Sequence, residues 1–415
     1  SGLRYAVIWV REANVDAWIS VRDRNTANML SELLAQKKAN YLMTDFDAYY
    51  VGNELRFSGV WVRRTARNVL TSNVALSGSA ITQLQAKIAS YVALGGDNRK
   101  GSLGFYIEDL SNGNYIAYNP HEPFYLASAA KTFIASKVVS SPELPLGNLY
   151  TLATSDWRGE TTRGFTKSDI GDTFPVSEYL DHMIDGSDSA STDKLSGLIA
   201  SFDGALAVNA HLDDDASMLN VGEITTICQV DKRIQGNADS CVHSVPCHSF
   251  ESWFRAGDLS YSSAADIACF QKVNASGVST DRRYDLFYHS LANSVTPAEV
   301  GRFFRALGEH ELHTAFDEGD LVRELDKNNS FQPPANGAFE RWGGKDGGKY
   351  KVKTWIGLAF DFDFDTGDYS SLTHQFSIAV FTEDWTADDP TGDALATAIV
   401  GDVIQTAVPY LAAKR

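Results

Sequence analysis

In Phe124-Tyr-Leu-Ala-Ser128-Ala-Ala-Lys131-Thr-Phe-Ile-Ala135, a serine precedes a lysine by three residues at the start of an apolar helix. This spacing places the hydroxyl and the ammonium group on adjacent turns of one helix face. A lysine that apolar neighbours desolvate has a lowered pKa and can accept the proton of a serine nucleophile. The same pattern also occurs where a serine caps a helix and a solvated lysine follows. The segment therefore indicates nucleophilic catalysis only if other segments supply matching groups.

Two further segments carry polar residues in an arrangement that suits a catalytic site. Met183-Ile-Asp-Gly-Ser187-Asp188-Ser189 is a loop of short polar residues that runs into a helix. Arg341-Trp-Gly-Gly-Lys345-Asp346-Gly347-Gly348 precedes a predicted strand, and its glycines would let a backbone N–H approach a ligand closely. Lys345 would add a positive field there. The alternatives are an ordinary helix cap for the first segment and a flexible turn with a solvated lysine for the second.

The elements around these segments predict an α+β fold. A helix over residues 81–94 ends at Gly95-Gly96, and residues 103–118 form a hairpin with an Asn112-Gly113 turn. Residues 355–360 and 376–381 form a second hairpin, and a helix over residues 394–407 follows it. The order helix, hairpin, mostly helical middle, hairpin and helix predicts an antiparallel sheet flanked by helices.

Together the three segments resemble the motifs of the serine β-lactamases and penicillin-binding proteins, the class A branch especially. That family carries S-x-x-K, S-D-N and K-T-G in this order, and the resemblance covers about residues 80–415. It implies a β-lactamase/transpeptidase-like domain in which Ser128 is the acylated nucleophile and Lys131 its proton acceptor. It also implies that Ser187 passes the proton to the leaving amine and that Lys345 holds the substrate. The backbone N–H groups of Ser128 and Gly348 would form the oxyanion hole.

The departures from the family pattern concern the substrate and the second half of the reaction. Ser189 stands where the family has Asn, and Lys345-Asp346-Gly347 has Asp in place of Thr. The resemblance implies that Ser189, Asp346 and Gly347 contact the substrate. The Asp346 carboxylate would repel the carboxylate that this family usually binds, so we expect poor recognition of β-lactams. The acidic base of class A deacylation has no clear counterpart, because Glu223 lacks an Asn four residues later.

The first 76 residues contain an internal repeat. Arg4-Tyr-Ala-Val-Ile-Trp9-Val-Arg11 returns 52 residues later as Arg56-Phe-Ser-Gly-Val-Trp61-Val-Arg63, with Trp at the same place in both copies. Apolar residues from Met29 to Leu34 recur at helical spacing between the copies, and residues 41–50 are typical of a strand. We therefore expect a small βαβ-type repeat domain over residues 1–76, shortened from a longer array, ahead of the hydrolase domain at 77–415.

The four cysteines, Cys228, Cys241, Cys247 and Cys269, lie close together in one loop-rich region. An even number in such a region favours two disulfides and an oxidising compartment, and three pairings are open. The alternative is a zinc site that adds nearby histidines, but the spacing fits no standard zinc pattern. We assign this region to a disulfide-bearing insertion in the hydrolase domain around residues 203–285.

Charge and processing signals predict where the protein works. The chain has 53 Asp and Glu residues against 36 Lys and Arg residues, which gives a net charge of −17. Such a surface should repel nucleic acid and anionic lipid, and no apolar run approaches the roughly 18 residues of a spanning helix. Sequons at Asn274 and Asn328 are compatible with N-glycosylation. We expect a secreted, monomeric enzyme with no cofactor or metal and no nucleic-acid or membrane partner.

A closer resemblance includes the N-terminal region. Trp-bearing repeats ahead of a disulfide-containing β-lactamase-like domain are similar to the polyglycine hydrolases, which are secreted fungal endopeptidases that act in host–pathogen interaction. This resemblance implies cleavage of Gly-Gly bonds in the polyglycine linker of plant class IV chitinases, so the partner would be a protein substrate bound as an extended backbone. Two alternatives stay open. One is a β-lactamase-like esterase or D-amino-acid peptidase, and the other is a non-catalytic binding module on the same scaffold.

Overall fold

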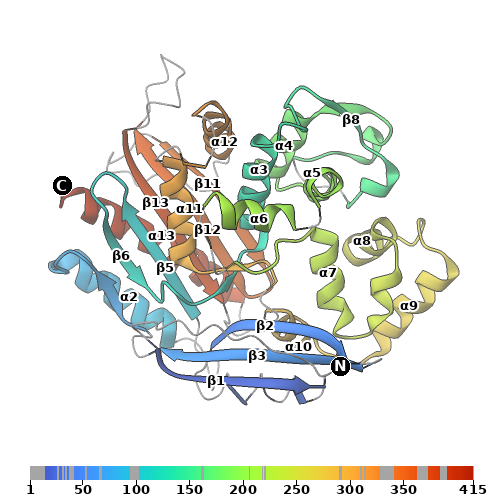
Figure 1. Ribbon diagram of the computed structural model, residues 1–415, viewed down its shortest axis with the longest axis horizontal. Coiled ribbons are helices and arrows are strands. Elements are labelled where there is room, and N and C mark those ends of the chain that lie inside the picture. Colours follow the sequence, from blue (N-terminus) through green and yellow to red (C-terminus); the bar gives the residue numbers. More distant parts are fainter. Residues whose placement is uncertain are drawn as a thin grey trace. The chain divides into compact units, whose positions relative to one another are not determined.

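The chain divides into two compact units, residues 1–69 and 70–415, which Figure 1 shows in a computed structural model. The structure describes all residues except 1–14, 26–27, 30–31, 33–34, 37–41, 52–53, 65–67, 94–101, 160–162, 205, 217, 219–220, 289–291, 309–310, 313–314, 328–340, 362–372, 384–389 and 415. The first copy of the internal repeat, at residues 4–11, and the sequon at Asn328 therefore lie outside the described residues.

The smaller unit contains a three-stranded antiparallel sheet in the order β1-β3-β2. Its strands are β1 (Val15–Arg24), β2 (Leu42–Val51) and β3 (Glu54–Arg64). Strands β2 and β3 confirm the two strands expected there, whereas β1 was not expected. The described residues 28, 29, 32, 35 and 36 are helical, so a helical segment connects β1 to β2 while β3 lies between them. That the unit repeats remains a prediction.

The larger unit is organised around a six-stranded antiparallel sheet in the order β11-β12-β13-β5-β6-β4. Both expected hairpins are confirmed, and β13 pairs with β5, so that the two hairpins meet at the centre of the sheet. Gly113 has a φ of +71° and allows the tight turn between β5 and β6. The strands are β4 (Leu70–Ser72), β5 (Ser102–Asp109), β6 (Asn114–Tyr118), β11 (Arg341–Lys349), β12 (Val352–Asp361) and β13 (Thr373–Glu383).

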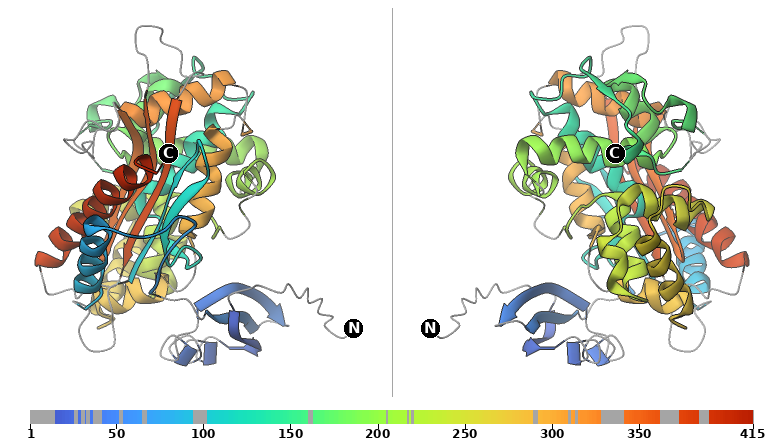
Figure 2. Two further views of the ribbon diagram at one scale, coloured as in Figure 1. Left: turned by 90° about the vertical axis from the view of Figure 1, so that its left-hand side faces the viewer. Right: turned by 90° about the vertical axis from the view of Figure 1, so that its right-hand side faces the viewer.

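Helices cover both faces of this sheet, as Figures 1 and 2 show. Helices α2 (Ser79–Ala93) and α13 (Pro390–Ala412) pack on one face, where their apolar side chains share a core with the strands. Helices α3 (Lys131–Val139), α11 (Pro297–Gly308) and α12 (Ala315–Lys327) share the core of the other face. The expected α+β fold, with an antiparallel sheet flanked by helices, is confirmed.

Shorter elements complete the larger unit. A two-stranded sheet pairs β7 (Phe124–Tyr125), which shortly precedes Ser128 in the chain, with β10 (Ser294–Val295). A second pair is formed by β8 (Leu149–Thr151) and β9 (Thr173–Pro175). The 3₁₀ turns η2 (Thr154–Asp156) and η3 (Lys167–Asp169) lie between β8 and β9. The helices that follow β9 are α4 (Val176–Ile184), α5 (Ser189–Asp203) and α6 (Ala207–Asp214).

Helix α13 corrects one expectation. Its segment Ala394–Ala412 is long and apolar enough to cross a membrane by length and composition, although no such stretch was expected. The core of the larger unit explains why α13 is so apolar, because residues buried in that core recur along the helix at intervals of three and four. These residues are Ala396, Ile399, Val400, Val403, Ile404, Ala407, Val408 and Leu411. Packing on the sheet is therefore sufficient to explain the hydropathy.

We call residues 227–288 the disulfide segment. It contains α7 (Ile227–Gly236), η4 (Ser240–Ser244), α8 (Cys247–Ala256), α9 (Ala264–Ala275) and α10 (Thr280–Tyr288). Disulfides join Cys228 to Cys247 and Cys241 to Cys269, which selects one of the three pairings. Because both disulfides together use all four cysteines, no thiolate is left for the zinc alternative.

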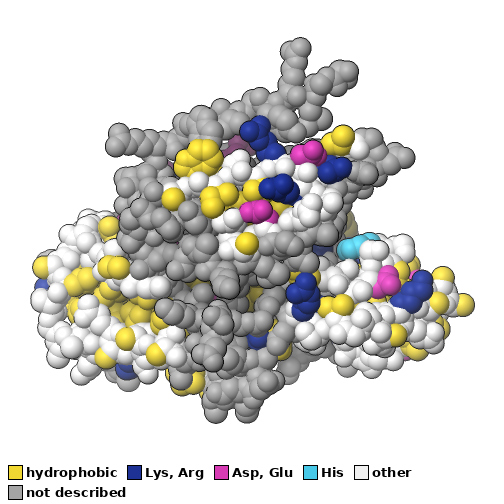
Figure 3. Space-filling view, turned by 90° about the horizontal axis from the view of Figure 1, so that it is seen from below, with side chains coloured by type: hydrophobic (Ala, Val, Ile, Leu, Met, Phe, Trp, Pro, Cys, Tyr) yellow, Lys and Arg dark blue, Asp and Glu magenta, His cyan; other side chains and the backbone are white. Residues whose placement is uncertain are grey.

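On the face shown in Figure 3, Lys and Arg side chains lie singly or in small groups, with Asp and Glu side chains among them. Electrostatic attraction of nucleic acid depends on basic side chains gathered into a patch. The described residues on this face show no continuous basic patch. The absence of a nucleic-acid partner remains a prediction.

We predict that each disulfide stabilises the larger unit by restricting the unfolded chain. Their partners are 19 and 28 residues apart, so the loss of either one should lower the free energy of unfolding by about 3 kcal/mol. Denaturant unfolding of a double Cys228→Ala, Cys247→Ala variant measures this loss. Peptide mapping without reduction is the control, and linked peptides with any other pairing would contradict the topology.

Candidate active site

Ser128 lies in the 3₁₀ turn η1 (Ala127–Ala130), which leads directly into α3. The preceding residue, Ala127, has a φ of +49°, in the left-handed region that residues with a Cβ rarely adopt. Strained backbone of this kind persists only where the surrounding structure holds it, and it concentrates at functional sites. Ser128 is half-buried, whereas Ala129 and Ala130 behind it are buried. The turn thus presents the serine hydroxyl at the start of a buried helix.

Gly347 allows strand β11 to pack against this turn. A Cβ at Gly347 would collide with the carbonyl oxygen of Leu126 and lie 3.0 Å from the amide nitrogen of Ala129. Only a glycine therefore fits the strand this close to the backbone around Ser128. The expected alternative of a flexible turn for residues 341–348 is wrong, because these residues form an ordered strand paired with β12.

Lys131 begins α3 and is almost completely buried, with 1% of its surface exposed. Its Nζ donates to the backbone carbonyl oxygen of Ser187 and lies 2.9 Å from the Oγ of the same residue. Burial lowers the pKa of Lys131 well below its ordinary value, and the charge of Lys345 lowers it further, against the opposing fields of Asp188 and Asp346. The neutral amine, which can accept a proton, is therefore far more populated than in a solvated lysine.

Ser187 comes from the tight loop that precedes α5. Its φ is +52°, a second left-handed residue at the site, and the next residue, Asp188, caps the helix. The Asp188 carboxylate accepts hydrogen bonds from Ser191 N at 2.7 Å and Ser191 Oγ at 2.6 Å. This cap fixes the loop before α5, and Ser187 in that loop contacts Lys131 of α3. The cap predicted as the alternative for this segment is real, and it belongs to Asp188.

Lys345 and Asp346 stand on opposite faces of β11. Lys345 is buried with 1% exposed, while the side chain of Asp346 is 52% exposed, as expected of neighbours along a strand. Lys345 Nζ nevertheless lies 2.6 Å from Asp346 Oδ1. At this position of β11, the Lys345 ammonium group faces the side of Lys131 and the Asp346 carboxylate faces solvent.

The other predicted residues have different surroundings. Gly348 lies in β11 opposite Lys353, and Ser189 is nearly buried in the first turn of α5. Glu223 is exposed and forms an ion pair with Arg233 at 2.8 Å. Asn274 is exposed near the end of α9. The oxyanion hole, the substrate contacts and the glycosylation remain predictions.

A Ser–His–Asp chain, which spacing alone did not predict, lies elsewhere in the unit. Ser136 Oγ is 2.9 Å from His211 Nε2, and His211 Nδ1 is 2.6 Å from Asp215 Oδ2. Ser136 is fully buried inside α3, so a substrate could not reach its hydroxyl. Burial also lowers the pKa of His211, against the opposing effect of Asp215. We interpret the chain as a buried polar link between α3 and α6.

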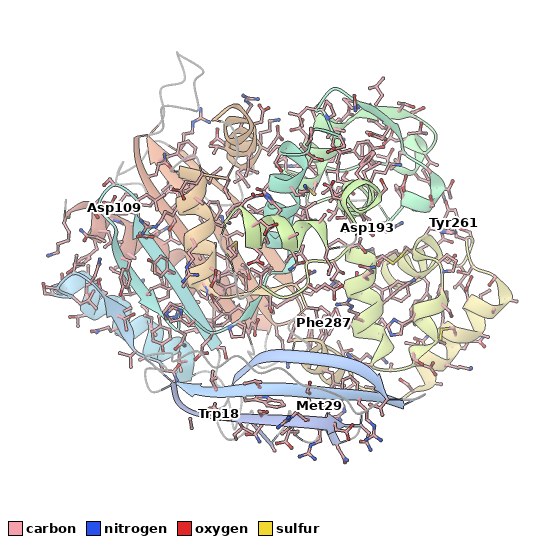
Figure 4. All side chains as sticks on the ribbon, in the orientation of Figure 1. Trp18, Met29, Asp109, Asp193, Tyr261 and Phe287 are labelled. Atoms are coloured by element: carbon pink, nitrogen blue, oxygen red, sulfur yellow. A yellow bond between two sulfur atoms is a disulfide. The ribbon has the colours of Figure 1, made fainter. Side chains whose placement is uncertain are left out.

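Sequence reasoning missed the contact that connects α5 to the disulfide segment. Asp193, labelled in Figure 4 between α5 and α7, accepts a hydrogen bond from Arg158 Nε at 2.7 Å. The same carboxylate accepts the backbone N–H groups of Ile227 and Cys228 at the first turn of α7. A sequence pattern could not reveal this contact, because its partners are 34 and 35 residues apart and join separate helices.

Comparisons with known proteins were made by sequence and by structure. Residues 83–214 match the model of the beta-lactamase enzyme family, a range that includes Ser128, Lys131 and Ser187 but ends before Lys345. No curated protein matches the chain. The match covers the first two motifs, and the third rests on the structure alone.

Solved β-lactamases are similar in fold. The chain aligns with a β-lactamase from Sphaerobacter thermophilus with a TM-score of 0.51 and 17% identity, over 78% of this chain and 96% of that one. It aligns with a class A β-lactamase from Mycobacterium abscessus with a TM-score of 0.50 and 17% identity, over 79% and 98%. A mutant class A enzyme of the last common ancestor of Gram-negative bacteria gives 0.50 and 18%, over 78% and 98%. The larger unit therefore has the fold of the β-lactamase-like serine hydrolases.

Proposed function

We propose that the larger unit is a serine hydrolase that works through an acyl-enzyme on Ser128. The observation that supports this proposal best is the environment of Lys131, whose buried amine has a lowered pKa and bonds to Ser187. A lysine without a charged partner is costly to bury unless it is used in its neutral form. A non-catalytic module would gain nothing from this arrangement.

The acylation step follows from these positions. Lys131 takes the proton from Ser128 Oγ as that oxygen attacks the carbonyl carbon of the substrate. The proton then passes through Ser187 Oγ, 2.9 Å from Lys131 Nζ, to the leaving amine as the scissile C–N bond breaks. The N–H groups of Ser128 and Gly348 stabilise the oxyanion. The positive charge of Lys345 lowers the pKa of Lys131, so that Lys131 gives up its proton readily.

Deacylation reverses the roles of the same groups. Once the amine has left with its proton, Lys131 is neutral again and can take a proton from a water molecule that attacks the acyl carbonyl. The proton returns to Ser128 Oγ as the ester bond breaks. Lys131 is the base in this scheme because the exposed Glu223 is paired with Arg233 instead.

The substrate that fits best is a neutral, extended peptide. The exposed Asp346 carboxylate disfavours an anionic group at the site and favours N–H donors. Strand β11 is the first strand in the sheet order and pairs with β12 on one side, so its other edge can hydrogen-bond to an added peptide backbone. We infer that the protein is a secreted, monomeric fungal endopeptidase that cleaves Gly-Gly bonds in the polyglycine linkers of plant class IV chitinases.

A β-lactamase-like esterase or D-amino-acid peptidase is the second candidate. The family match over residues 83–214 favours it, because the match covers the nucleophile and proton-transfer groups without reference to peptide linkers. Hydrolysis of nitrocefin or a short-chain ester, without cleavage of a polyglycine linker, would select this second function.

The first prediction from the proposed function concerns Ser128. Digestion of a chitinase that carries a polyglycine linker should yield two fragments whose masses place the cut between glycines. Ser128→Ala should lower the cleavage rate at least about a thousandfold, because the nucleophile is lost. Ser140→Ala, at the far end of the same helix, is the control and should cleave normally. Equal cleavage by wild type and Ser128→Ala would overturn the role of Ser128.

The second prediction uses the effect of Lys345 on Lys131. In Lys345→Met the positive charge is gone, so the pKa of Lys131 should rise and its neutral form should appear only at higher pH. The acid limb of the profile of acylation rate against pH should therefore move to higher pH. Lys137→Met is the control, because it removes a positive charge from α3, the helix that also carries Lys131. Lys137 pairs with Asp203 at 2.8 Å, and its loss should leave the acid limb of the pH profile in place. An unmoved limb in Lys345→Met would refute the coupling.

The third prediction concerns the close packing at Gly347. Gly347→Ala should push β11 away from the Ser128 turn and slow acylation by about a hundredfold. Gly197→Ala is the matched control, since a Cβ there meets open space on α5. Stopped-flow acylation with a serine-directed probe measures both rates. A Gly347→Ala rate close to that of the control would mean that the packing does not position the nucleophile.

A further inference from the structure

Helix α7 of the disulfide segment touches the elements on both sides of the candidate site. On one side, Asp193 of α5 binds the N–H groups of Ile227 and Cys228 at the start of α7. Helix α5 begins at Ser189, two residues after Ser187, so this contact joins α7 to the helix that follows the proposed proton-transfer hydroxyl. Helix α7 is therefore fixed at its first turn to one wall of the site.

On the other side, Asp231 of α7 binds Lys349 at the end of β11. Asp231 is fully buried, and its second oxygen lies 3.1 Å from Arg255 Nη2. Lys349 directly follows Gly348, whose N–H we assign to the oxyanion hole. Burial alone would lower the pKa of Lys349, but the charge of Asp231 and its hydrogen bond raise that pKa above its ordinary value, so the Lys349 amine keeps its charge. One buried carboxylate thus holds the last residue of the strand.

The disulfide segment orients this carboxylate through helical spacing. Cys228 and Asp231 are three residues apart on α7, and Cys247, Glu251 and Arg255 are spaced by four on α8. Residues at these spacings share a helix face, so the Cys228–Cys247 disulfide and the charged cluster connect the same two faces. Arg255 also binds Glu251 Oε2 at 2.6 Å, and the burial of Glu251 raises its pKa to about 7.

We propose that Asp231 and Lys349 are a positioning pair that fixes the end of β11, so that the disulfide segment sets the geometry of the oxyanion hole. The proposal rests on the proposed function for its catalytic consequence, while the pair itself stands on the contacts above. Strand β11 is the first strand in the sheet order, and among the described strands it pairs with β12 alone, so the contact with Asp231 gives its end a second support next to Gly348. A misplacement of about 1 Å at such a group is enough to slow a reaction a hundredfold.

The test compares Asp231→Asn and Lys349→Met in the full chain. Each should lower kcat about ten- to a hundredfold with little change in KM, because the pair positions the strand and does not hold the ground-state substrate. The double variant should be no slower than either single variant, since both remove one interaction. Lys349→Arg, which keeps the cation, should retain most of the activity.

Arg233→Gln is the matched control, because Arg233 lies on α7 two residues after Asp231 and makes a surface ion pair with Glu223. It should leave kcat unchanged within about twofold. Hydrogen exchange of peptides from Arg341–Lys349 supplies a readout that needs no activity. Exchange there should rise in Asp231→Asn and Lys349→Met but stay unchanged in Arg233→Gln. If Asp231→Asn fails to fold, Lys349→Met still tests the pair, because the side chain of Lys349 is less buried than that of Asp231.

The outcomes separate the two proposals. An active wild type with slowed Asp231→Asn and Lys349→Met supports the positioning pair. If instead both variants match Arg233→Gln in kcat and in hydrogen exchange, the positioning pair is overturned. A wild type inert towards peptides and serine-directed probes would sink the proposed function. In that case, raised exchange in β11 would still support the coupling of the pair to the strand, and unchanged exchange would refute it.

Discussion

Burial of the Lys131 amine is the constraint on which the site depends. Among the described residues, its Nζ bonds to the carbonyl oxygen and the hydroxyl of Ser187 and to no carboxylate. A charged ammonium group is unfavourable in this buried setting, and the cost of burying the charge lowers the pKa of Lys131. The same burial that disfavours the charge makes the amine a base. The helix start, the Ser187 loop and Lys345 matter because each maintains this environment.

Three elements must meet within a few ångströms for this environment to exist. The turn η1 carries Ser128 and leads into α3, which begins with Lys131. The loop before α5 presents Ser187, and β11 brings Lys345. Each junction uses a local feature that costs stability in isolation, such as the left-handed backbone at Ala127 and Ser187 or the glycine at Gly347. The extensive cores on both faces of the sheet offset these costs.

Much of this arrangement was predictable from local patterns. The hairpins, α2 and α13 follow from alternation, helical periodicity and turn residues, which depend on neighbours in the chain. Ser128 with Lys131 and Ser187 with Asp188 were predictable because their chemistry lies within one turn of a helix. The apolar length of α13 was underestimated, and its apolar residues are explained by packing on the sheet, which local patterns do not show. Strand β1 was not expected, because no element was assigned to residues 15–22 from the sequence.

Local sequence thus specified the α+β order of elements and the three candidate residues Ser128, Lys131 and Ser187. The tertiary structure decided the disulfide pairing, the bond between Lys131 and Ser187, and the chain of contacts from Asp193 through α7 to Asp231 and Lys349. These partners are separated by 19 to 118 residues. Folding brings these distant groups together and excludes water from between the charged ones, so the charges interact strongly only in the folded protein. Patterns of neighbouring residues in the sequence therefore do not predict these contacts.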